Sequence, residues 1–66
     1  MTDKQAQKIV EMANPGWEVV QPVVTRVDED GEAKMIKLQP KIKTSGVTIS
    51  KMVIVDKDGR IIGESG

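Results

Sequence analysis

The stretches VDEDG at residues 27–31 and VDKDG at residues 55–59 constrain the fold more than any other feature of the sequence. In each, the first Asp can accept backbone N–H groups, and the final Gly can adopt a positive φ angle. Asp-Gly between two apolar runs is a strong short-range signal for a β-hairpin. Both stretches therefore predict hairpin turns, each a type I turn with a G1 bulge. The flanking segments differ, so one turn solution used twice accounts for the repeat.

The N-terminal segment has the periodicity of a helix. Its apolar residues recur at the i, i+3, i+4 and i+7 spacing of one helical face: Ala6, Ile9, Val10 and Ala13. Thr2 or Asp3 can cap the first turn with a side-chain oxygen. Asn14 in the left-handed conformation, followed by Pro15, is expected to end the helix. We therefore expect a helix at about residues 3–13.

Runs of β-branched or alternating apolar residues predict four strands after this helix. They lie at about residues 17–27, 33–43, 47–55 and 60–64. Pro22 lacks an N–H group, so it fits the first strand only at a sheet edge or a bulge. The TSG sequence at residues 44–46 is expected to turn between the second and third strands. The predicted fold is a single small α+β domain over residues 1–66, with one N-terminal helix followed by a four-stranded antiparallel meander sheet.

The length and composition restrict how such a domain is stabilised. A chain of 66 residues buries only about 60% of its unfolded surface. Small domains commonly gain stability from disulfides, metals or partners. The sequence has no Cys and no His, which excludes disulfides, thiolate and imidazole metal ligands, and imidazole catalysis. Association with a partner is the common route that remains.

Charge and hydropathy restrict the partners. Ten basic and ten acidic residues give a formal net charge of zero, whereas nucleic-acid binders normally carry a strongly basic face. No apolar run approaches the ~18 residues of a membrane span. The first residues, MTDKQAQK, lack the apolar core of a signal peptide. We therefore expect a cytoplasmic protein with no membrane or nucleic-acid partner.

No combination of residues predicts an enzyme. The hydroxyl residues lie in no recognisable nucleophile motif, and no His is present to take their protons. The glycines are isolated, so no phosphate-binding loop is formed. The carboxylates are expected in turns, where water keeps them ionised. We therefore expect no catalytic residue, no cofactor and no enzymatic activity.

The acidic turns leave one alternative open. In a meander both turns lie at the same end of the sheet, where they would form an acidic rim of Asp28, Glu29, Asp30, Glu32, Asp56 and Asp58. A weak site for a hard cation such as calcium is one interpretation, and a solvated rim is the other. An EF-hand loop is excluded, because alignment on Gly31 or Gly59 puts Arg26 or Ile54 at the first ligand position. No metal ligand is assigned.

Four residues are candidate interface residues: Trp17, Lys37, Lys41 and Lys43. Trp17, the only aromatic residue, lies at the corner between helix and first strand. It either closes the core over the helix or anchors an interface. The three lysines share one face of the predicted second strand, with Lys51 nearby. They could contact phosphate or an acidic partner, or could protect an edge strand from pairing.

An excess of apolar residues on both strand faces is the main functional signal. Pairs such as Val19-Val20, Val23-Val24 and Ile61-Ile62 place one side chain on each face. One short helix covers only one face, so the other stays exposed unless another chain covers it. The sequence therefore predicts a small non-enzymatic protein-binding or assembly module. We expect it to form a homo-oligomer through a sheet face or edge, or to cover another protein.

Two segments also carry a resemblance to a known family. The helix-to-strand portion contributes Ala6, Lys8, Ile9, Val10, Pro15, Val19, Val20, Pro22 and Val23, and the terminal hairpin contributes MVIVDKDGRI at 52–61 and the closing ESG. These segments resemble the potato inhibitor I family of serine-protease inhibitors. The resemblance implies an inhibitor with its reactive loop within residues 24–50. Only Arg26 is present there to brace a loop, and the region is predicted as a hairpin, so the implied alternative is an inhibitor with an altered reactive loop.

Overall fold

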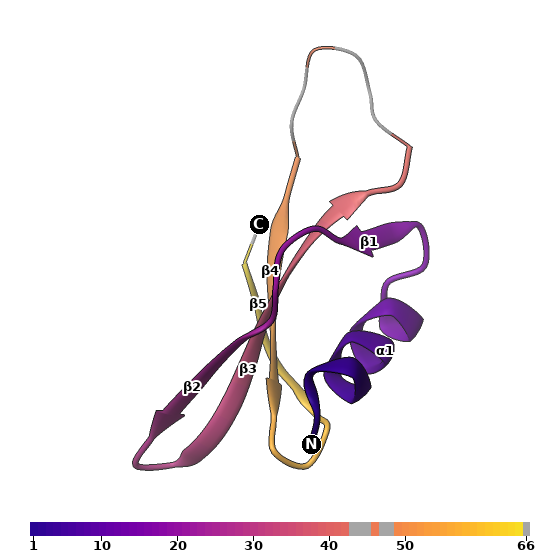
Figure 1. Cartoon of the computed structure of the whole chain (residues 1–66). Coiled ribbons are helices and arrows are strands. Elements are labelled where there is room, and N and C mark those ends of the chain that lie inside the picture. The colour runs from indigo at the N-terminus through magenta and orange to yellow at the C-terminus, as the bar shows by residue number, and fades with distance from the viewer. Residues whose placement is uncertain (43–45, 47–48, 66) are drawn as a thin grey trace.

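The computed structural model describes residues 1–42, 46 and 49–65. In this part of the chain one helix is followed by five strands (Figure 1). They are α1 (Asp3–Ala13), β1 (Trp17–Val19), β2 (Val24–Asp28), β3 (Gly31–Pro40), β4 (Lys51–Asp56) and β5 (Ile61–Ser65). The predicted α+β class, with an N-terminal helix and an antiparallel sheet, is confirmed. The sheet has five strands rather than the four that were expected.

The extra strand arises because the predicted strand at residues 17–27 is interrupted. β1 pairs with the end of β3, from Trp17 opposite Pro40 to Val19 opposite Leu38. β2 pairs with the beginning of β3, where Val24 lies opposite Met35. Pro22 lies in the interruption, where its missing N–H group disturbs no ladder. β1 and β2 therefore follow one another along the same edge of β3, and the meander order continues through β4 to β5.

The other strands differ from the prediction at their ends. β3 covers residues 31–40 rather than 33–43, β4 covers 51–56 rather than 47–55, and β5 covers 61–65 rather than 60–64. The turn predicted at residues 44–46 lies largely outside the described residues.

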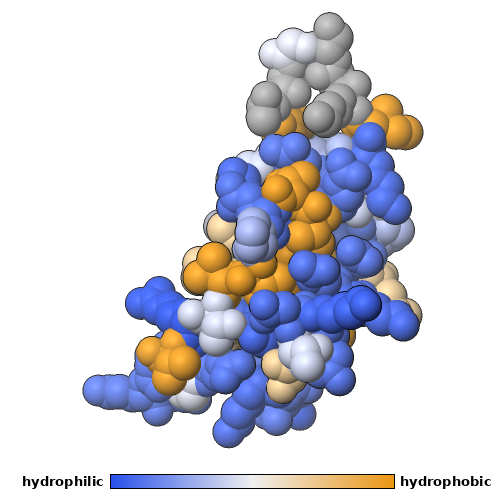
Figure 2. All heavy atoms as spheres, in the orientation of Figure 1, coloured by the Kyte–Doolittle hydropathy of each residue, from blue (hydrophilic) through white to orange (hydrophobic). Residues whose placement is uncertain are grey.

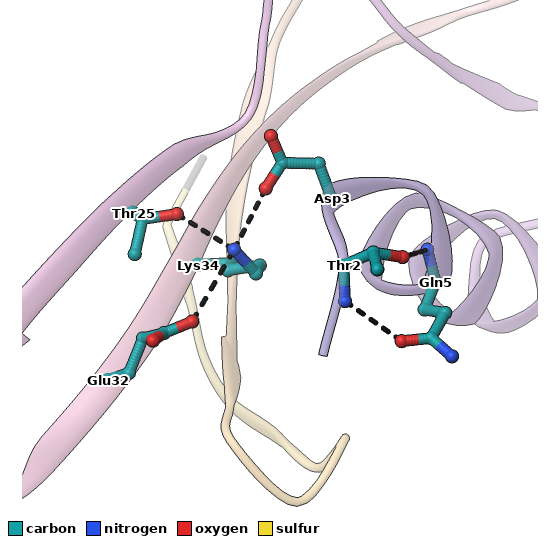
Figure 3. Close-up of polar contacts among 6 residues, drawn as sticks. All are labelled: Thr2, Asp3, Gln5, Thr25, Glu32 and Lys34. Atoms are coloured by element: carbon teal, nitrogen blue, oxygen red, sulfur yellow. Dashed lines mark hydrogen bonds and ion pairs between the residues drawn. The ribbon is translucent and has the colours of Figure 1, made fainter.

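Local side-chain contacts explain both ends of α1. Thr2 Oγ1 accepts a hydrogen bond from the Gln5 backbone N–H at 3.2 Å, and Gln5 Oε1 accepts one from the Thr2 N–H at 2.8 Å (Figure 3). This capping box satisfies two free donors of the first turn. At the other end, the prediction of a left-handed Asn14 is wrong, because its φ angle is −130°. Its side chain instead donates to the Val10 carbonyl at 2.9 Å, and Gly16 supplies the positive φ of 88°.

The core lies between α1 and one face of β3 and β4. Its fully buried side chains are Ala6, Val10, Ile36, Leu38, Val53 and Val55. They come from one stripe of the helix and from alternate positions of the two central strands, as the helical and strand periodicities require. Partly buried side chains close the edge of this cluster, among them Val19, Val23 and Ile61. The opposite face of the sheet has no helix over it in the described structure.

The two Asp-x-Asp-Gly stretches form hairpin turns, as predicted, and lie at the same end of the sheet (Figure 1). Asp28 Oδ1 accepts the Asp30 N–H at 2.9 Å. Asp56 Oδ1 accepts two N–H groups, those of Asp58 and Arg60, each at 2.9 Å. Each turn therefore uses its first carboxylate as an internal acceptor.

Candidate functional site

The sheet face turned away from α1, here called the open face, is the candidate site. Strand pairing aligns four of its residues in one line across the sheet. Val24 lies opposite Met35, Met35 opposite Ile54, and Ile54 opposite Gly63. We call these four residues the apolar row. It crosses β2, β3, β4 and β5, so it extends over the full width of the sheet.

The exposure of the apolar row changes from one edge to the other. Val24 is 58% exposed at the β2 edge, whereas Met35 and Ile54 are half-buried by their neighbours. At the β5 edge, the Ile54 side chain leans over Gly63, and its Cδ1 lies 3.4 Å from where a Cβ of residue 63 would be. The row thus ends in an exposed valine on one side and, on the other, in a glycine that the Ile54 side chain covers.

Charged residues flank the apolar row. Towards the turns, Arg26 lies opposite Ala33, and Ala33 lies opposite Asp56. On the other side, Lys37 lies opposite Met52. Figure 2 shows that one face of the molecule gathers apolar side chains over its middle, surrounded by hydrophilic ones. Apolar surface bordered by charge is typical of protein-binding surfaces.

The structure distributes the predicted interface residues over different places. Trp17 is half-buried and packs against the core, and Lys51 Nζ lies 4.4 Å from the centre of its ring. Lys37 lies on the open face, half-buried, whereas Lys41 is exposed beyond the end of β3. Lys43 lies outside the described residues. Trp17 and Lys37 are therefore not part of one surface.

Lys51, expected near the three lysines, does not share a sheet face with Lys37. Its position on β4 pairs with Leu38, which faces the helix, and its ammonium group lies 3.4 Å from Glu64 Oε1. Lys37 is one position removed from Leu38 and faces the other way. The side chains of Lys37 and Lys51 therefore lie on opposite faces of the sheet.

The acidic rim shows no metal-binding arrangement. One oxygen of Asp28 and one of Asp56 already accept backbone N–H groups within their own turns. Among the described residues, no group of three acidic side chains is placed so that it could hold a metal ion.

A hollow lies between α1 and the turn that joins β4 to β5. It is an open groove of about 520 Å³ with Met1, Ile9 and Met12 along its apolar part and Lys57 at its rim. Ile9 also lies against Gly59 of the turn. Of the predicted interface residues that the structure describes, Trp17, Lys37 and Lys41, none lines this groove.

A buried lysine was missed at the sequence level. Lys34 has a side chain only 8% exposed, on the face of β3 that carries Ile36 and Leu38. Its Nζ lies 2.8 Å from Asp3 Oδ1 and 2.8 Å from Thr25 Oγ1, so it joins the first turn of α1 to the sheet (Figure 3). The strand alternation, which puts residue 34 in phase with residue 36, was the signal that could have found it.

The surroundings of Lys34 favour its charged form. The hydrogen bond to Asp3 raises the pKa of the lysine above its ordinary value of 10.5, burial acts against this, and the charges of Asp3 and Glu32 add to the increase. Because the pKa of Lys34 is higher in the folded state than in the unfolded state, its interactions stabilise the fold in full at pH values below the unfolded-state pKa. The contribution is lost as the pH rises through the folded pKa.

Replacing Asp3 by Asn is therefore expected to lower the urea midpoint of unfolding. The gap, meaning the difference in midpoint between the unmodified chain and the Asp3→Asn chain, should depend on pH. The gap should be constant up to about pH 10 and should narrow above it, as Lys34 loses its proton. Trp17 fluorescence in urea titrations between pH 8 and 11.5 measures it. Glu11→Gln, an exposed change elsewhere on α1, is the control and should show no such narrowing. A gap for Asp3→Asn that persists unchanged to pH 11.5 would contradict this role of the ion pair.

In the part of the chain that the structure describes, no helix is long and apolar enough to cross a membrane. Comparison with protein-family models, with curated proteins and with solved structures finds no significant match. Functional inference for this chain therefore starts from its own residues and their geometry.

Proposed function

We propose that this protein is a non-enzymatic protein-binding or assembly module that associates through the open face of its sheet. The observation that carries the proposal is the apolar row, in which Val24, Met35 and Ile54 occupy neighbouring strands on the face that α1 does not cover. Antiparallel sheets tolerate one face in water when that face is polar. A continuous apolar line on it is more typical of a surface that another chain covers.

The size of the core supports the same proposal. The buried cluster is small, and it lies on one side of the sheet only. Covering Met35, Met52 and Ile54 would remove further apolar surface from water, at about 25 cal/mol per Å². Methionine side chains are flexible and polarizable, so they adapt to the shape of a partner.

The serine-protease inhibitor implied by the family resemblance stays a prediction. The pairing of residues 24–28 with 31–35 favours the binding module, because an inhibitory loop has to be extended and unpaired to enter a protease. Inhibition of subtilisin or chymotrypsin at micromolar concentration would support the inhibitor.

Two exposed valines of β2 provide a matched test of the open face. Val24 lies opposite Met35 and faces the open side, whereas Val27 lies opposite Glu32 and faces the other side. They are 58% and 74% exposed, so lysine at either position should leave the fold intact. The immobilised chain and the variants Val24→Lys and Val27→Lys are incubated with cell extract to which a tagged copy of the chain is added.

The expected result is a protein, either the tagged copy or another, that the unmodified chain and Val27→Lys retain and that Val24→Lys loses. A lysine at residue 24 would place a charge in an apolar contact, which is costly without a partner of opposite sign. Circular dichroism of the three chains checks that all are folded. Equal retention by all three would refute the open face as the binding surface.

A further inference from the structure

We infer that the occupant of the open face is a second copy of this chain, packed face to face about a two-fold axis that runs parallel to the strands between β3 and β4. This inference rests on the proposed function, and it names the partner and its orientation. The argument comes from the order of side chains along the apolar row and its neighbours. A two-fold contact requires one surface to be complementary to itself.

Rotation about this axis lays β2 over β5 of the second copy, and β3 over β4 of the second copy. Each row of residues across the strands then faces the same row of the second copy, with the order of the strands reversed. Val24, exposed at one edge, comes to lie over Gly63 of the second copy, beside the Ile54 side chain that leans over this glycine. Met35 comes to lie over Ile54 of the second copy. The most exposed side chain of the row thus meets the glycine end of the row, and the two central apolar residues meet one another.

The flanking rows are complementary under the same rotation. The aliphatic part of Lys37 would lie over Met52 of the second copy, with its ammonium group at the rim. In the row towards the turns, Ala33 would lie over Asp56 of the second copy. Arg26 is the neighbour of Ala33, so its guanidinium group would come within reach of that carboxylate. The symmetry makes two such pairs of opposite charge.

The alternative two-fold axis, directed across the strands, is less favourable. It would place Val24 against Val24 of the second copy, and Gly63 against Gly63. It would also place Lys37 of one copy between Arg26 and Asp56 of the other, so attraction and repulsion would offset each other. The order of residues therefore selects the axis parallel to the strands.

The contact area sets the expected affinity. Four strands about 4.8 Å apart, each contributing about six residues at ~3.3 Å, present roughly 400 Å² of face per copy. This is about half of the ~800 Å² per partner that a standard stable interface buries, an area typical of weak, transient contacts. We therefore expect a reversible dimer with a dissociation constant in the micromolar range.

Sedimentation velocity of the purified chain from about 5 μM to 1 mM tests whether the partner is a second copy of the chain. The expected result is a monomer–dimer equilibrium that Val24→Lys weakens by at least about tenfold and that Val27→Lys leaves unchanged. A chain that stays monomeric to 1 mM, or a dimer weakened equally by both variants, would overturn the inference. If the pure chain is monomeric while Val24→Lys still abolishes capture from extract, the second-copy inference fails and the proposed function stands.

Cross-linking tests the orientation, and the natural absence of Cys makes it specific. A mixture of Val24→Cys and Gly63→Cys chains is treated with a short bis-maleimide. The axis parallel to the strands predicts a cross-linked product between the two different chains. It predicts none from Val24→Cys alone, because those two residues lie at opposite edges of the dimer. A strong product from Val24→Cys alone would select the axis across the strands and overturn the proposed packing.

Discussion

Replacing Leu38 by Ala is expected to lower the free energy of unfolding by about 2–5 kcal/mol. Leu38 is fully buried on the central strand β3, where it pairs with Val19 on one side and with Lys51 on the other. Removal of its branched end leaves a cavity that the small core cannot close. A domain of this length has roughly 3–10 kcal/mol of stability in total, so the variant should lose a large fraction of its stability. Urea titration followed by Trp17 fluorescence and circular dichroism measures the loss.

The control for this prediction is Ile42→Ala. Ile42 follows β3 closely in sequence but is 87% exposed, so its truncation removes no buried contact. Its effect should stay within about 0.5 kcal/mol. If Leu38→Ala and Ile42→Ala destabilise the chain equally, the core is not located between α1 and the sheet.

Replacing Gly59 by Ala is expected to produce the second large effect. Gly59 has a φ angle of 84°, a conformation that costs a residue with a Cβ about 1–2 kcal/mol. A Cβ at this position would also lie 3.2 Å from Ile9 Cδ1, so the side chain of Ile9 would have to move. We expect a total loss of roughly 2–3 kcal/mol, from strain in the turn and from altered packing of α1. The urea midpoint measures it.

Gly16→Ala separates these two contributions. Gly16 has nearly the same φ angle, 88°, but no atom lies within 4 Å of a Cβ built there. The Gly16→Ala variant should therefore lose only the free energy that backbone strain costs. Gly59→Ala should lower the free energy of unfolding by about 1 kcal/mol more than Gly16→Ala does. Shortening Ile9 to Val in the Gly59→Ala background should recover part of that difference. Equal losses at the two glycines would mean that the contact between Ile9 and the turn adds nothing.

The candidate site could be predicted from the sequence only in outline. Runs of adjacent apolar residues indicated that both sheet faces carry hydrophobic side chains. They did not indicate which residues meet, because neighbours in the apolar row come from separate strands. Trp17 and the lysines attracted attention by residue type. The structure places Trp17 against the core and Lys41 beyond the end of β3.

By itself the sequence determined the features that depend on nearby residues. The helix at residues 3–13 follows from its capping box and periodicity, and the two hairpin turns follow from Asp carboxylates that accept N–H groups two to four residues ahead. Such contacts form within a few residues of the chain, so short patterns predict them.

Only the tertiary structure decided the features that join distant segments. The break between β1 and β2 depends on how both strands pair with β3, and the burial of Lys34 depends on Asp3, which is 31 residues away in the sequence. The apolar row depends on the register of four strands at once. These arrangements depend on strand register and on contacts between segments far apart in the sequence, which cannot be evaluated within any short segment.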